Sequence, residues 1–289
     1  MRVDKKKQIV PAVRSRKLSP TEQRNPRSMK LDRMSVADSV QLMLSEEAKV
    51  TRALSQKSAL LARAVHAVAS AFRSGGRLFY FGAGTSGRLG VLDASECPPT
   101  FRADPEMVQG FIAGGDVALR RSVEGAEDDA DAAGHEVRAR RVGRKDVVVG
   151  IAASGTTPFV WGALGEAKRR GATTILICFN PHLEIPRALQ PKIVIAPDLG
   201  PEVLTGSTRL KCGTATKLIL NMLTTLAMVR AGKVMSNLMV DVLPGNSKLR
   251  DRATRIVREL TGDSYAEAGT ALRAHGWVIR KAVARRDRK

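Results

Sequence analysis

A glycine-rich turn that carries two adjacent hydroxyl groups is the first stretch of this chain whose residues could do chemistry. Residues 82–87 (GAGTSG) lie between an apolar run at 78–81 and a stretch with helical spacing at 88–92. A strand, a tight turn and a helix start, in this order, direct backbone N–H groups and the positive end of the helix dipole toward an anion. The hydroxyls of Thr85 and Ser86 add hydrogen-bond donors, and Gly84 allows close approach of the backbone. The turn therefore predicts a site for a phosphate group.

The same turn matches the G-x-G-x-x-G pattern of dinucleotide-binding proteins. That pattern also requires an acidic residue at the tip of the second strand, about 20 residues on, to bind a ribose hydroxyl. The second apolar run, residues 107–112, is followed by Ala113, Gly114 and Gly115, with no carboxylate. A phosphosugar therefore fits the turn better than a dinucleotide. A tight turn with solvated hydroxyls is the other interpretation.

A second turn repeats this combination of hydroxyl groups and glycine. Ser154, Gly155 and Thr157 follow the apolar run 147–152 and precede a stretch with helical spacing. One phosphate bound between two helix N-termini would explain both turns. Capping of the following helix by Ser154 and Thr157 is the alternative.

A third polar segment, residues 200–211, precedes a long helix expected to end near Gly232. It contains Ser207, Thr208 and Lys211. A lysine in the first turn of a helix opposes the helix dipole. Either a bound anion offsets this charge or the lysine is solvated.

Two sets of carboxylates stand out in this otherwise basic chain. Glu96 lies in residues 94–99, where Pro98 and Pro99 are expected to end a helix. Glu124 and Glu127 belong to an acidic stretch at 123–129, which we expect to be helical, with both side chains on one face. Carboxyl groups held in different protonation states can act as general acid and base. Salt bridges and a solvated acidic face are the alternatives.

The elements that must position these residues follow from the pattern of apolar runs. Runs at 78–81, 107–112, 147–152, 174–179 and 193–195 alternate with helical stretches, which predicts a five-stranded parallel sheet buried on both faces. Ligands of such sheets bind at the carboxyl ends of the strands, so the loops after residues 81, 112 and 152 are candidates for the site. Residues 35–73 read as helical, with Ser35 and Ser45 as caps of two helices.

The composition indicates a globular protein of the cell interior. Of 289 residues, 43% are hydrophobic and only 4% aromatic, so aliphatic residues must build the core. No apolar run approaches the roughly 18 residues that cross a membrane, no secretory segment is evident, and we expect a cytoplasmic protein. The scattered cysteines Cys97, Cys178 and Cys212 are expected to be reduced thiols. The four histidines have no metal-ligand spacing, so neither a metal nor another cofactor is predicted.

The net charge of +20 raises the question of an anionic partner. Many of the cations lie in the first 33 residues and in the last ten. Basic tails can bind nucleic acid, but no aromatic residue interleaves the N-terminal run. Solvated or disordered tails are the preferred interpretation, and nucleic acid is not an expected partner.

Several long stretches resemble one family, the bacterial N-acetylmuramic acid 6-phosphate etherases, which have the sugar isomerase (SIS) fold. The likeness extends from about residue 21 to at least residue 267. The stretches that carry it are 82–90 (GAGTSGRLG), 93–100 (DASECPPT), 124–128 (EGAED), 150–155 (GIAASG), 205–211 (TGSTRLK) and 237–241 (NLMVD). The related vertebrate glucokinase regulatory protein shares parts of this pattern in a longer chain with two SIS domains.

The resemblance implies cleavage of the lactyl ether of N-acetylmuramic acid 6-phosphate, in the recycling of cell-wall peptidoglycan. By this likeness Glu96 protonates the leaving lactate oxygen and then activates water, and Glu127 removes the C2 proton. The expected substrate- and phosphate-binding residues come from all three polar segments: Gly84, Thr85, Ser86, Ser154, Gly155, Thr157, Ser207, Thr208 and Lys211. Family members are dimers with sites near the subunit interface, so a homodimer is expected. No cofactor is implied.

The likeness also fixes the expected architecture. It is a three-layer, doubly wound SIS-type α/β fold with a five-stranded parallel sheet and helical additions at both ends. We expect a basic, disordered tail at 1–20, a helical arm at 21–75, the phosphosugar-binding domain at 76–245, and a short C-terminal helical region at 246–289.

Two features depart from the family pattern. Thr156 stands where family members usually have an arginine, and the region after Thr261 is shorter than usual. A phosphosugar-binding regulatory protein without catalysis therefore remains the alternative to the etherase. Glu96 and Glu127 favour the enzyme, because a sensor needs no acid–base pair. An aldose–ketose isomerase on the same fold would not explain the etherase motifs.

Overall fold

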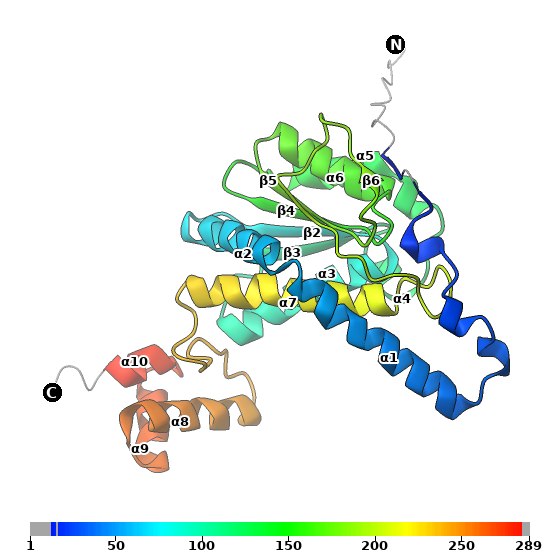
Figure 1. The fold of residues 1–289 in the computed structure, drawn as a ribbon. Helices are drawn as coiled ribbons and strands as arrows, with labels where there is room; N and C mark the ends of the chain where they lie inside the picture. The colour runs from blue at the N-terminus through cyan, green and yellow to red at the C-terminus, as the bar shows by residue number, and fades with distance from the viewer. Residues whose placement is uncertain (1–12, 16, 285–289) are drawn as a thin grey trace, which may run out of the picture.

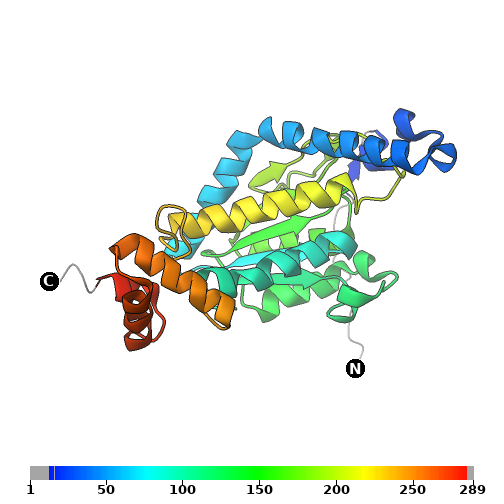
Figure 2. The ribbon, with the colours of Figure 1, turned by 90° about the horizontal axis from the view of Figure 1, so that it is seen from below.

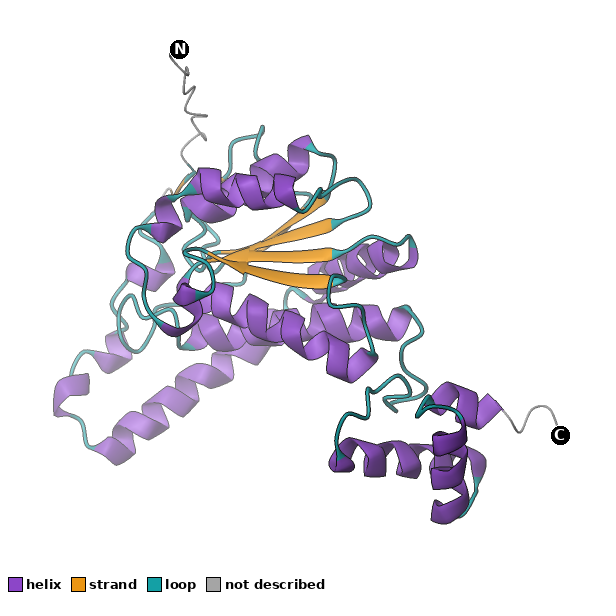
Figure 3. Cartoon of the chain, turned by 180° about the vertical axis from the view of Figure 1, so that it is seen from behind, coloured by secondary structure: helices purple, strands orange, loops and turns teal. Residues whose placement is uncertain are grey.

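Five short apolar strands form the parallel sheet at the centre of the computed structural model, which describes residues 13–15 and 17–284 (Figures 1 and 3). The strands are β2 (Leu78–Gly82), β3 (Val108–Ile112), β4 (Val147–Ile151), β5 (Thr173–Ile177) and β7 (Ile193–Ile195). The prediction of five parallel strands is confirmed, and each lies within two residues of its expected bounds.

The order of strands in the sheet is β3-β2-β4-β5-β7. The chain leaves β2 toward one edge to form β3 and then returns to the other side of β2 to form β4. The winding direction thus changes between β2 and β4, which is where ligands of doubly wound sheets bind. Gly82 at the end of β2 pairs with both Ile112 and Ile151, so three strand ends meet at this point.

Helices cover both faces of the sheet and complete three layers (Figure 1). Alternation along β2 sends Leu78 and Tyr80 into one core and Phe79 and Phe81 into the other. The first core lies under α2 (Ser58–Arg73), α3 (Gly84–Phe101) and α7 (Lys211–Arg230), and the second under α5 (Ala130–Ala139) and α6 (Pro158–Arg169). The three-layer, doubly wound α/β fold expected from the sequence is confirmed.

The N-terminal arm consists of one long helix preceded by short turns of 3-10 helix (Figure 1). These elements are η1 (Pro20–Glu22), η2 (Pro26–Ser28), η3 (Leu31–Arg33) and α1 (Val36–Ser55). Ser35 caps α1 as predicted, because its hydroxyl accepts a hydrogen bond from the Asp38 backbone N–H. The prediction that Ser45 caps a second helix is wrong. Ser45 lies inside α1, and its hydroxyl donates to the Leu42 carbonyl at 2.7 Å.

A two-stranded antiparallel sheet joins the start of the described chain to the α/β body. Arg14–Ser15 form β1, and Leu183–Glu184 form β6. Residues 1–12 and 16 of the predicted disordered tail lie outside the described residues. Within the stretch predicted as a tail, the described residues Arg14 and Ser15 pair with Glu184 and Leu183.

The C-terminal region forms a small helical unit below the sheet domain (Figures 1 and 3). Its helices are α8 (Ser247–Thr261), α9 (Tyr265–Ala274) and α10 (Ile279–Ala284), which share a core of their own. Arg102, at the end of α3, donates to the carbonyls of Val242 and Trp277 and so ties this unit to the sheet domain. The expected C-terminal helical region is therefore present over residues 247–284.

Helix α7 is the one element of the described chain whose length and composition would suit a membrane span. More than half of it is buried, and it packs against α1, α2 and α3. Ile219, Leu220 and Leu223 are completely covered by these neighbours. The apolar composition of α7 is explained by its place in the protein core.

Candidate active site

The glycine-rich turn has the geometry that an anion requires. Gly84 adopts a φ of 52°, which favours glycine, and α3 begins there with Ala83 as its N-cap. No side chain among the described residues caps this turn, so its backbone N–H groups face the loop. A Cβ on Gly87 would lie 2.6 Å from the Gly82 carbonyl oxygen and 2.6 Å from Ile112 Cγ1. Only glycine at this position lets α3 approach the strand ends this closely.

The second hydroxyl-rich turn lies beside the first, because β4 pairs with β2. The Ser154 and Thr156 hydroxyls are 3.0 Å apart, and the Thr156 backbone N–H also donates to Ser154. Gly155 has a φ of 82°, and its carbonyl accepts a 2.7 Å hydrogen bond from the Trp161 indole. Thr157 is the N-cap of α6, but its side chain makes no capping hydrogen bond. The alternative that Thr157 serves only as a cap is therefore not supported.

The third polar segment also approaches the first turn. A Cβ on Gly213, in the first turn of α7, would lie 3.6 Å from Thr85 Cγ2 and 3.8 Å from the Thr208 carbonyl oxygen. Ser207 and Thr208 are both half-buried. The first turn of α7, with Thr208 next to it, thus lies beside Thr85 at the start of α3, and a common binding site here stays a prediction.

Lys211 neither faces a site for an external anion nor is solvated, which were the two alternatives from the sequence. Its ammonium group donates to Glu46 at 2.7 Å, to the Leu199 carbonyl at 2.9 Å and to the Pro201 carbonyl at 2.8 Å. The side chain is only 1% exposed, so the lysine is not solvated. All three N–H donors are used within the protein, and the predicted contact of Lys211 with substrate stays a prediction.

A buried carboxylate replaces the external anion at the start of α7. Glu202 is fully buried and accepts hydrogen bonds from the backbone N–H groups of Lys211 and Cys212, at 3.1 and 3.0 Å. Because this carboxylate satisfies the first turn and opposes the lysine charge, the N-terminus of α7 is already neutralised. Of the three helix starts in the predicted phosphate site, those of α3 and α6 therefore remain, and the site itself stays a prediction.

A cavity of about 200 Å³ connects the glycine-rich turn with the acidic stretch. Its lining contains the predicted residues Gly84 and Glu127. The remaining lining residues are Ala83, Arg88, Ala113, Ala118, Arg121, Ser122, Val123, Glu124, Gly125 and Ala126. The glycine-rich turn and the candidate base Glu127 thus line the same cavity at the carboxyl edge of the sheet.

Two arginines in this cavity were missed in the sequence analysis. Arg88 donates to the Leu119 carbonyl at 3.0 Å and to the Arg121 carbonyl at 3.3 Å, which joins α3 to the short helix α4 (Val117–Arg120). Arg121 is exposed and makes no side-chain hydrogen bond or ion pair within the described chain. Their positions in the sequence could have identified them, because Arg88 comes directly after the glycine-rich turn and Arg121 comes shortly before the acidic stretch. A cation here can bind an anionic substituent of a substrate.

The acidic stretch is a loop rather than the predicted helix. Gly125 has a φ of 74° and starts a single 3-10 turn, η4 (Ala126–Asp128), while α5 begins only at Ala130. The Glu124 carboxylate accepts a 2.7 Å hydrogen bond from Ser122. The predicted pairing of Glu124 and Glu127 on one helical face is therefore wrong. The glycine breaks the helix and leaves Glu127 exposed at the rim of the cavity.

Glu96 lies on α3 and outside this cavity. Pro98 and Pro99 do not end the helix as predicted, since α3 continues to Phe101. Glu96 is exposed, and no hydrogen bond or ion pair is found for its carboxylate in the described part of the chain. Within one chain, Glu127 therefore lines the cavity beside Gly84, whereas Glu96 lies outside it.

The comparisons with known proteins agree on the class of fold. Residues 60–168 match the family model described as the glucokinase regulatory protein N-terminal SIS domain. Phosphoheptose isomerases from Neisseria gonorrhoeae and Francisella tularensis superimpose with TM-scores of 0.52 and 0.50, at 16% and 17% identity. These alignments cover 67% and 68% of this chain and 98% and 100% of the isomerases. At such low identity they show the fold alone.

Curated relatives decide the family. N-acetylmuramic acid 6-phosphate etherase from Gloeobacter violaceus is 54% identical over 263 residues, which is 91% of this chain and 85% of the relative. The protein of that name from Cutibacterium acnes is 50% identical over 266 residues, or 92% of this chain and 87% of the relative. This chain belongs to the N-acetylmuramic acid 6-phosphate etherase family. The family resemblance predicted from the sequence is confirmed.

In this etherase-family chain a buried aspartate fixes α3, the helix that carries Glu96. The Asp93 carboxylate accepts hydrogen bonds from Asn221 at 2.7 Å, Thr224 at 3.2 Å and Tyr80 at 2.9 Å. Burial raises the pKa of Asp93, and the three hydrogen bonds oppose that rise. The sequence analysis did not single out Asp93, because its three partners come from β2 and α7.

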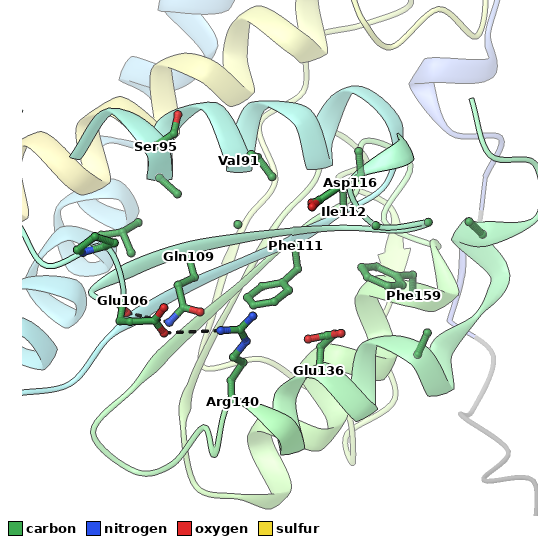
Figure 4. A pocket seen from close by; sticks show the side chains of 18 of the residues that line it. Val91, Ser95, Glu106, Gln109, Phe111, Ile112, Asp116, Glu136, Arg140 and Phe159 are labelled. Carbon is green, nitrogen blue, oxygen red and sulfur yellow. Dashed lines mark hydrogen bonds and ion pairs between the residues drawn. The ribbon is translucent and has the colours of Figure 1, made fainter. Parts of the chain in front are cut away.

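A larger groove of about 770 Å³ runs along the edge strand β3, between α3 and α5 (Figure 4). Arg140 crosses it, with an ion pair of 3.7 Å to Glu106 and a contact of 5.3 Å from its guanidinium carbon to the Phe111 ring centroid. The groove contains none of the predicted site residues. The smaller cavity beside Gly84 is therefore the better candidate for catalysis.

The titratable groups that could bind a metal or react as nucleophiles are dispersed. Among the described residues, no three histidine, cysteine or acidic side chains meet as a metal site. The cysteines are buried free thiols, as expected for reduced cysteines. Burial raises the pKa of Cys97 to about 12 and that of Cys178 to about 11, so these thiols are poor nucleophiles.

Proposed function

We propose that this protein is an enzyme that cleaves the D-lactyl ether of N-acetylmuramic acid 6-phosphate to N-acetylglucosamine 6-phosphate and D-lactate. One observation carries the proposal. In a chain 54% identical to a curated etherase, the cavity beside the phosphate-type turn at Gly84 also contains Glu127. An enzyme of this specificity belongs to the degradation of cell-wall amino sugars.

The proposed reaction is an elimination followed by addition of water, which makes the enzyme a carbon–oxygen lyase. Glu127 removes the proton on C2, which is acidic because C1 is an aldehyde in the open-chain sugar. The electron pair forms a double bond between C2 and C3, and the C3 ether oxygen leaves with a proton from Glu96. Water activated by Glu96 then adds to C3, and C2 regains a proton. The two glutamates must begin in opposite protonation states.

The phosphate is proposed to bind at the two open helix starts. Thr85 and Ser86 supply backbone N–H groups and hydroxyls from α3, and Ser154 and Thr157 supply hydroxyls from the turn before α6. Gly84 and Gly155 have positive φ angles of 52° and 82°, which favour glycine. Because glycine has no side chain, the backbone at both positions can come close to the phosphate. Ser207 and Thr208 are assigned to the wall of the site.

Lys211 is proposed to support the site rather than to contact the substrate. Its ammonium group is bound by Glu46 and two carbonyls. A contact with substrate would require these bonds to break, so its role here is to hold the segment that contains Thr208.

We propose that the protein acts in the cytoplasm as a homodimer. Exposed apolar side chains support a second copy as partner, since α1 carries a stripe at helical spacing with nothing of the described chain over it. The stripe consists of Val36, Val40, Met43 and Leu44, which are 40–81% exposed. Exposed apolar faces of this kind mark protein interfaces.

A phosphosugar-binding regulatory protein is the second candidate function. It is favoured by the match of residues 60–168 to a model named for the glucokinase regulatory protein, and by Thr156 in place of the arginine usual in etherases. Such a protein would bind the substrate or the product without releasing lactate. Its binding site would need the turns around Gly84 and Gly155 but neither glutamate.

Release of D-lactate from N-acetylmuramic acid 6-phosphate decides between these functions. The wild-type protein should release lactate, and Glu96→Ala and Glu127→Ala should each lose at least about a hundredfold in rate. Glu259→Ala is the matched control, because Glu259 is exposed on α8, outside the site. Tight binding of the phosphosugar by folded wild-type protein, with no lactate formed, would refute the etherase and support the regulatory protein.

A further inference from the structure

Two buried side chains bind the backbone carbonyl groups of the turn that follows β4. The Asn180 amide donates to the Ser154 carbonyl at 3.2 Å. The Trp161 indole donates to the Gly155 carbonyl at 2.7 Å. Asn180 is 1% exposed and Trp161 is 2% exposed. Two consecutive carbonyls are therefore held by donors that solvent does not reach.

These two hydrogen bonds decide which side of the turn is electrically positive. In a trans peptide group, the N–H points away from the C=O, and the described chain has no cis peptide bond. Because the Gly155 carbonyl is turned toward Trp161, the Thr156 N–H points the other way, 3.3 Å from the Ser154 hydroxyl oxygen. The Thr156 hydroxyl is 3.0 Å from the same oxygen. One N–H and two hydroxyl groups thus gather on the accessible side of the turn, where Thr156 is exposed.

An anion at this turn depends on dipoles, because the turn has no charged side chain. Residues 152–158 have the sequence AASGTTP. N–H and hydroxyl groups attract a phosphate, whereas a carbonyl oxygen that rotated toward it would repel it. The orientation of the two peptide groups therefore sets much of the affinity that this turn can supply.

The neighbours of Asn180 fix the orientation of its amide. Its Oδ1 accepts a hydrogen bond from the His182 backbone N–H at 3.1 Å, and its Nδ2 faces the Ser154 carbonyl. A backbone N–H only donates and a carbonyl only accepts, so exchanging the two amide atoms would break both bonds. Ser15 of β1 lies on the same side, with its Oγ 3.5 Å from Asn180 Oδ1. The loop after β5, which the sequence analysis did not consider, thus supports the turn.

The turn is also packed from behind. Trp161 belongs to the second core, on the face of the sheet that α5 and α6 cover. Figure 2 looks at the other face, where α3 and α7 cross in front of the strands. A Cβ on Gly155 would lie 2.7 Å from Leu183 Cδ2, so the backbone of the turn lies directly against the start of β6. The turn is therefore held between α6 and the segment after β5.

We propose that Asn180 and Trp161 are positioning residues of the phosphate site, which hold the Ser154 and Gly155 carbonyls away from the bound phosphate. This inference rests on the proposed function, because it takes the place of the phosphate from there, but it does not depend on the roles of the two glutamates. Each side chain acts through the turn and not by contact with the substrate.

Calorimetry with N-acetylglucosamine 6-phosphate tests the inference without any need for catalysis. Trp161→Phe removes the indole N–H but keeps an aromatic ring, and Asn180→Ala removes the amide. Each should raise Kd by about three- to tenfold, because the freed carbonyl can rotate toward the anion. Asn180→Asp keeps the size of the side chain and the acceptor for the His182 N–H, but replaces the donor with a charged oxygen. It should raise Kd by at least about thirtyfold.

Asn246→Ala is the matched control. The Asn246 side chain also binds the backbone, since it accepts from the Leu249 N–H at 2.9 Å, but it does so at the start of α8, outside the site. Loss of this cap should lower the free energy of unfolding and leave Kd unchanged. Urea unfolding of every variant separates a loss of stability from a loss of binding.

The lactate assay supplies a second readout. The variants of Asn180 and Trp161 should raise KM by the same factors as Kd and leave kcat within about twofold of the wild-type value. Wild-type Kd in Asn180→Asp, or a lower kcat at unchanged KM in Asn180→Ala and Trp161→Phe, would overturn the inference. If Asn180→Asp does not fold, an unchanged Kd in Trp161→Phe would overturn it as well. Weaker binding in these variants, with no lactate from the wild-type protein, would refute the etherase and support the inference.

Discussion

The Lys211 ammonium group lies 2.7 Å from the Glu46 carboxylate, and both side chains are only 1% exposed. This buried ion pair joins α1, in the N-terminal arm, to the first residue of α7. Arg27 and Lys49 bind the other oxygen of Glu46, each at 2.7 Å. The carboxylate is thus the centre of a cationic cluster that holds the arm against the segment before α7.

Glu46→Gln should destabilise the protein by about 3 kcal/mol, because it leaves the Lys211 charge buried without its counter-ion. Urea unfolding measures this loss directly. Glu259→Gln, which changes an exposed glutamate on α8, should leave the free energy of unfolding within about 0.5 kcal/mol of wild type. An equally small change in Glu46→Gln would show that the pair contributes little to stability.

The same carboxylate gives a specific dependence of stability on pH. Burial opposes ionisation, but hydrogen bonds from Lys211, Lys49 and Arg27 lower the pKa of Glu46 from 4.5 to about 2. A group with a lowered folded-state pKa contributes stability above its unfolded pKa and loses it as the pH falls through the folded value. The wild-type protein should therefore lose more stability than Glu46→Gln between pH 4.5 and 2. Parallel curves for the two proteins in acid urea titrations would contradict this.

Gly87→Ala should weaken phosphosugar binding at least tenfold while leaving most of the sheet intact. Its Cβ would lie 2.6 Å from the Gly82 carbonyl, so the start of α3 must move away from β2. Gly143→Ala is the matched control, because the nearest atom to its Cβ is 4.0 Å away. Calorimetry with N-acetylglucosamine 6-phosphate should show binding to the control and at least tenfold weaker binding to Gly87→Ala.

Thr156→Arg should strengthen binding of the phosphosugar, since it restores a cation beside the turn at Ser154. We expect KM to fall by about three- to tenfold at low salt, and the gain to shrink as ionic strength rises. Thr156→Gln, of similar length and no charge, should leave KM close to the wild-type value. A fall in KM with glutamine as large as that with arginine would assign the effect to shape rather than charge.

Asp93→Asn tests the support of α3. The amide cannot accept all three hydrogen bonds from Asn221, Thr224 and Tyr80, so we expect destabilisation of about 1–3 kcal/mol. Lactate release should fall through kcat with little change in KM, because the phosphate turn lies about two and a half helical turns away. Asp131→Asn, at an exposed position of α5, should change neither quantity. A higher KM at unchanged kcat would place Asp93 in substrate binding instead.

Local sequence determined the parts of this protein that depend on local physics. The five strands followed from apolar runs, since a strand buried on both faces must be apolar throughout. The turn at Gly84 followed from glycine and hydroxyl spacing, and the Ser35 cap from the preference for a side-chain acceptor at a helix start. Because the carboxyl ends of parallel strands share one edge, the sequence also predicted that the turns around Thr85 and Ser154 lie close together.

Only the tertiary structure decided the features that depend on distant partners. Lys211 reads as a site residue in sequence, but Glu46, 165 residues away in the chain, makes it part of a buried ion pair. The helix predicted around Glu127 is broken at Gly125, and the prolines after Glu96 are accommodated within α3. The separation of Glu96 from Glu127 depends on the length and direction of α3 in the fold. No local pattern specifies that distance, because it is set by how the helix packs across the sheet.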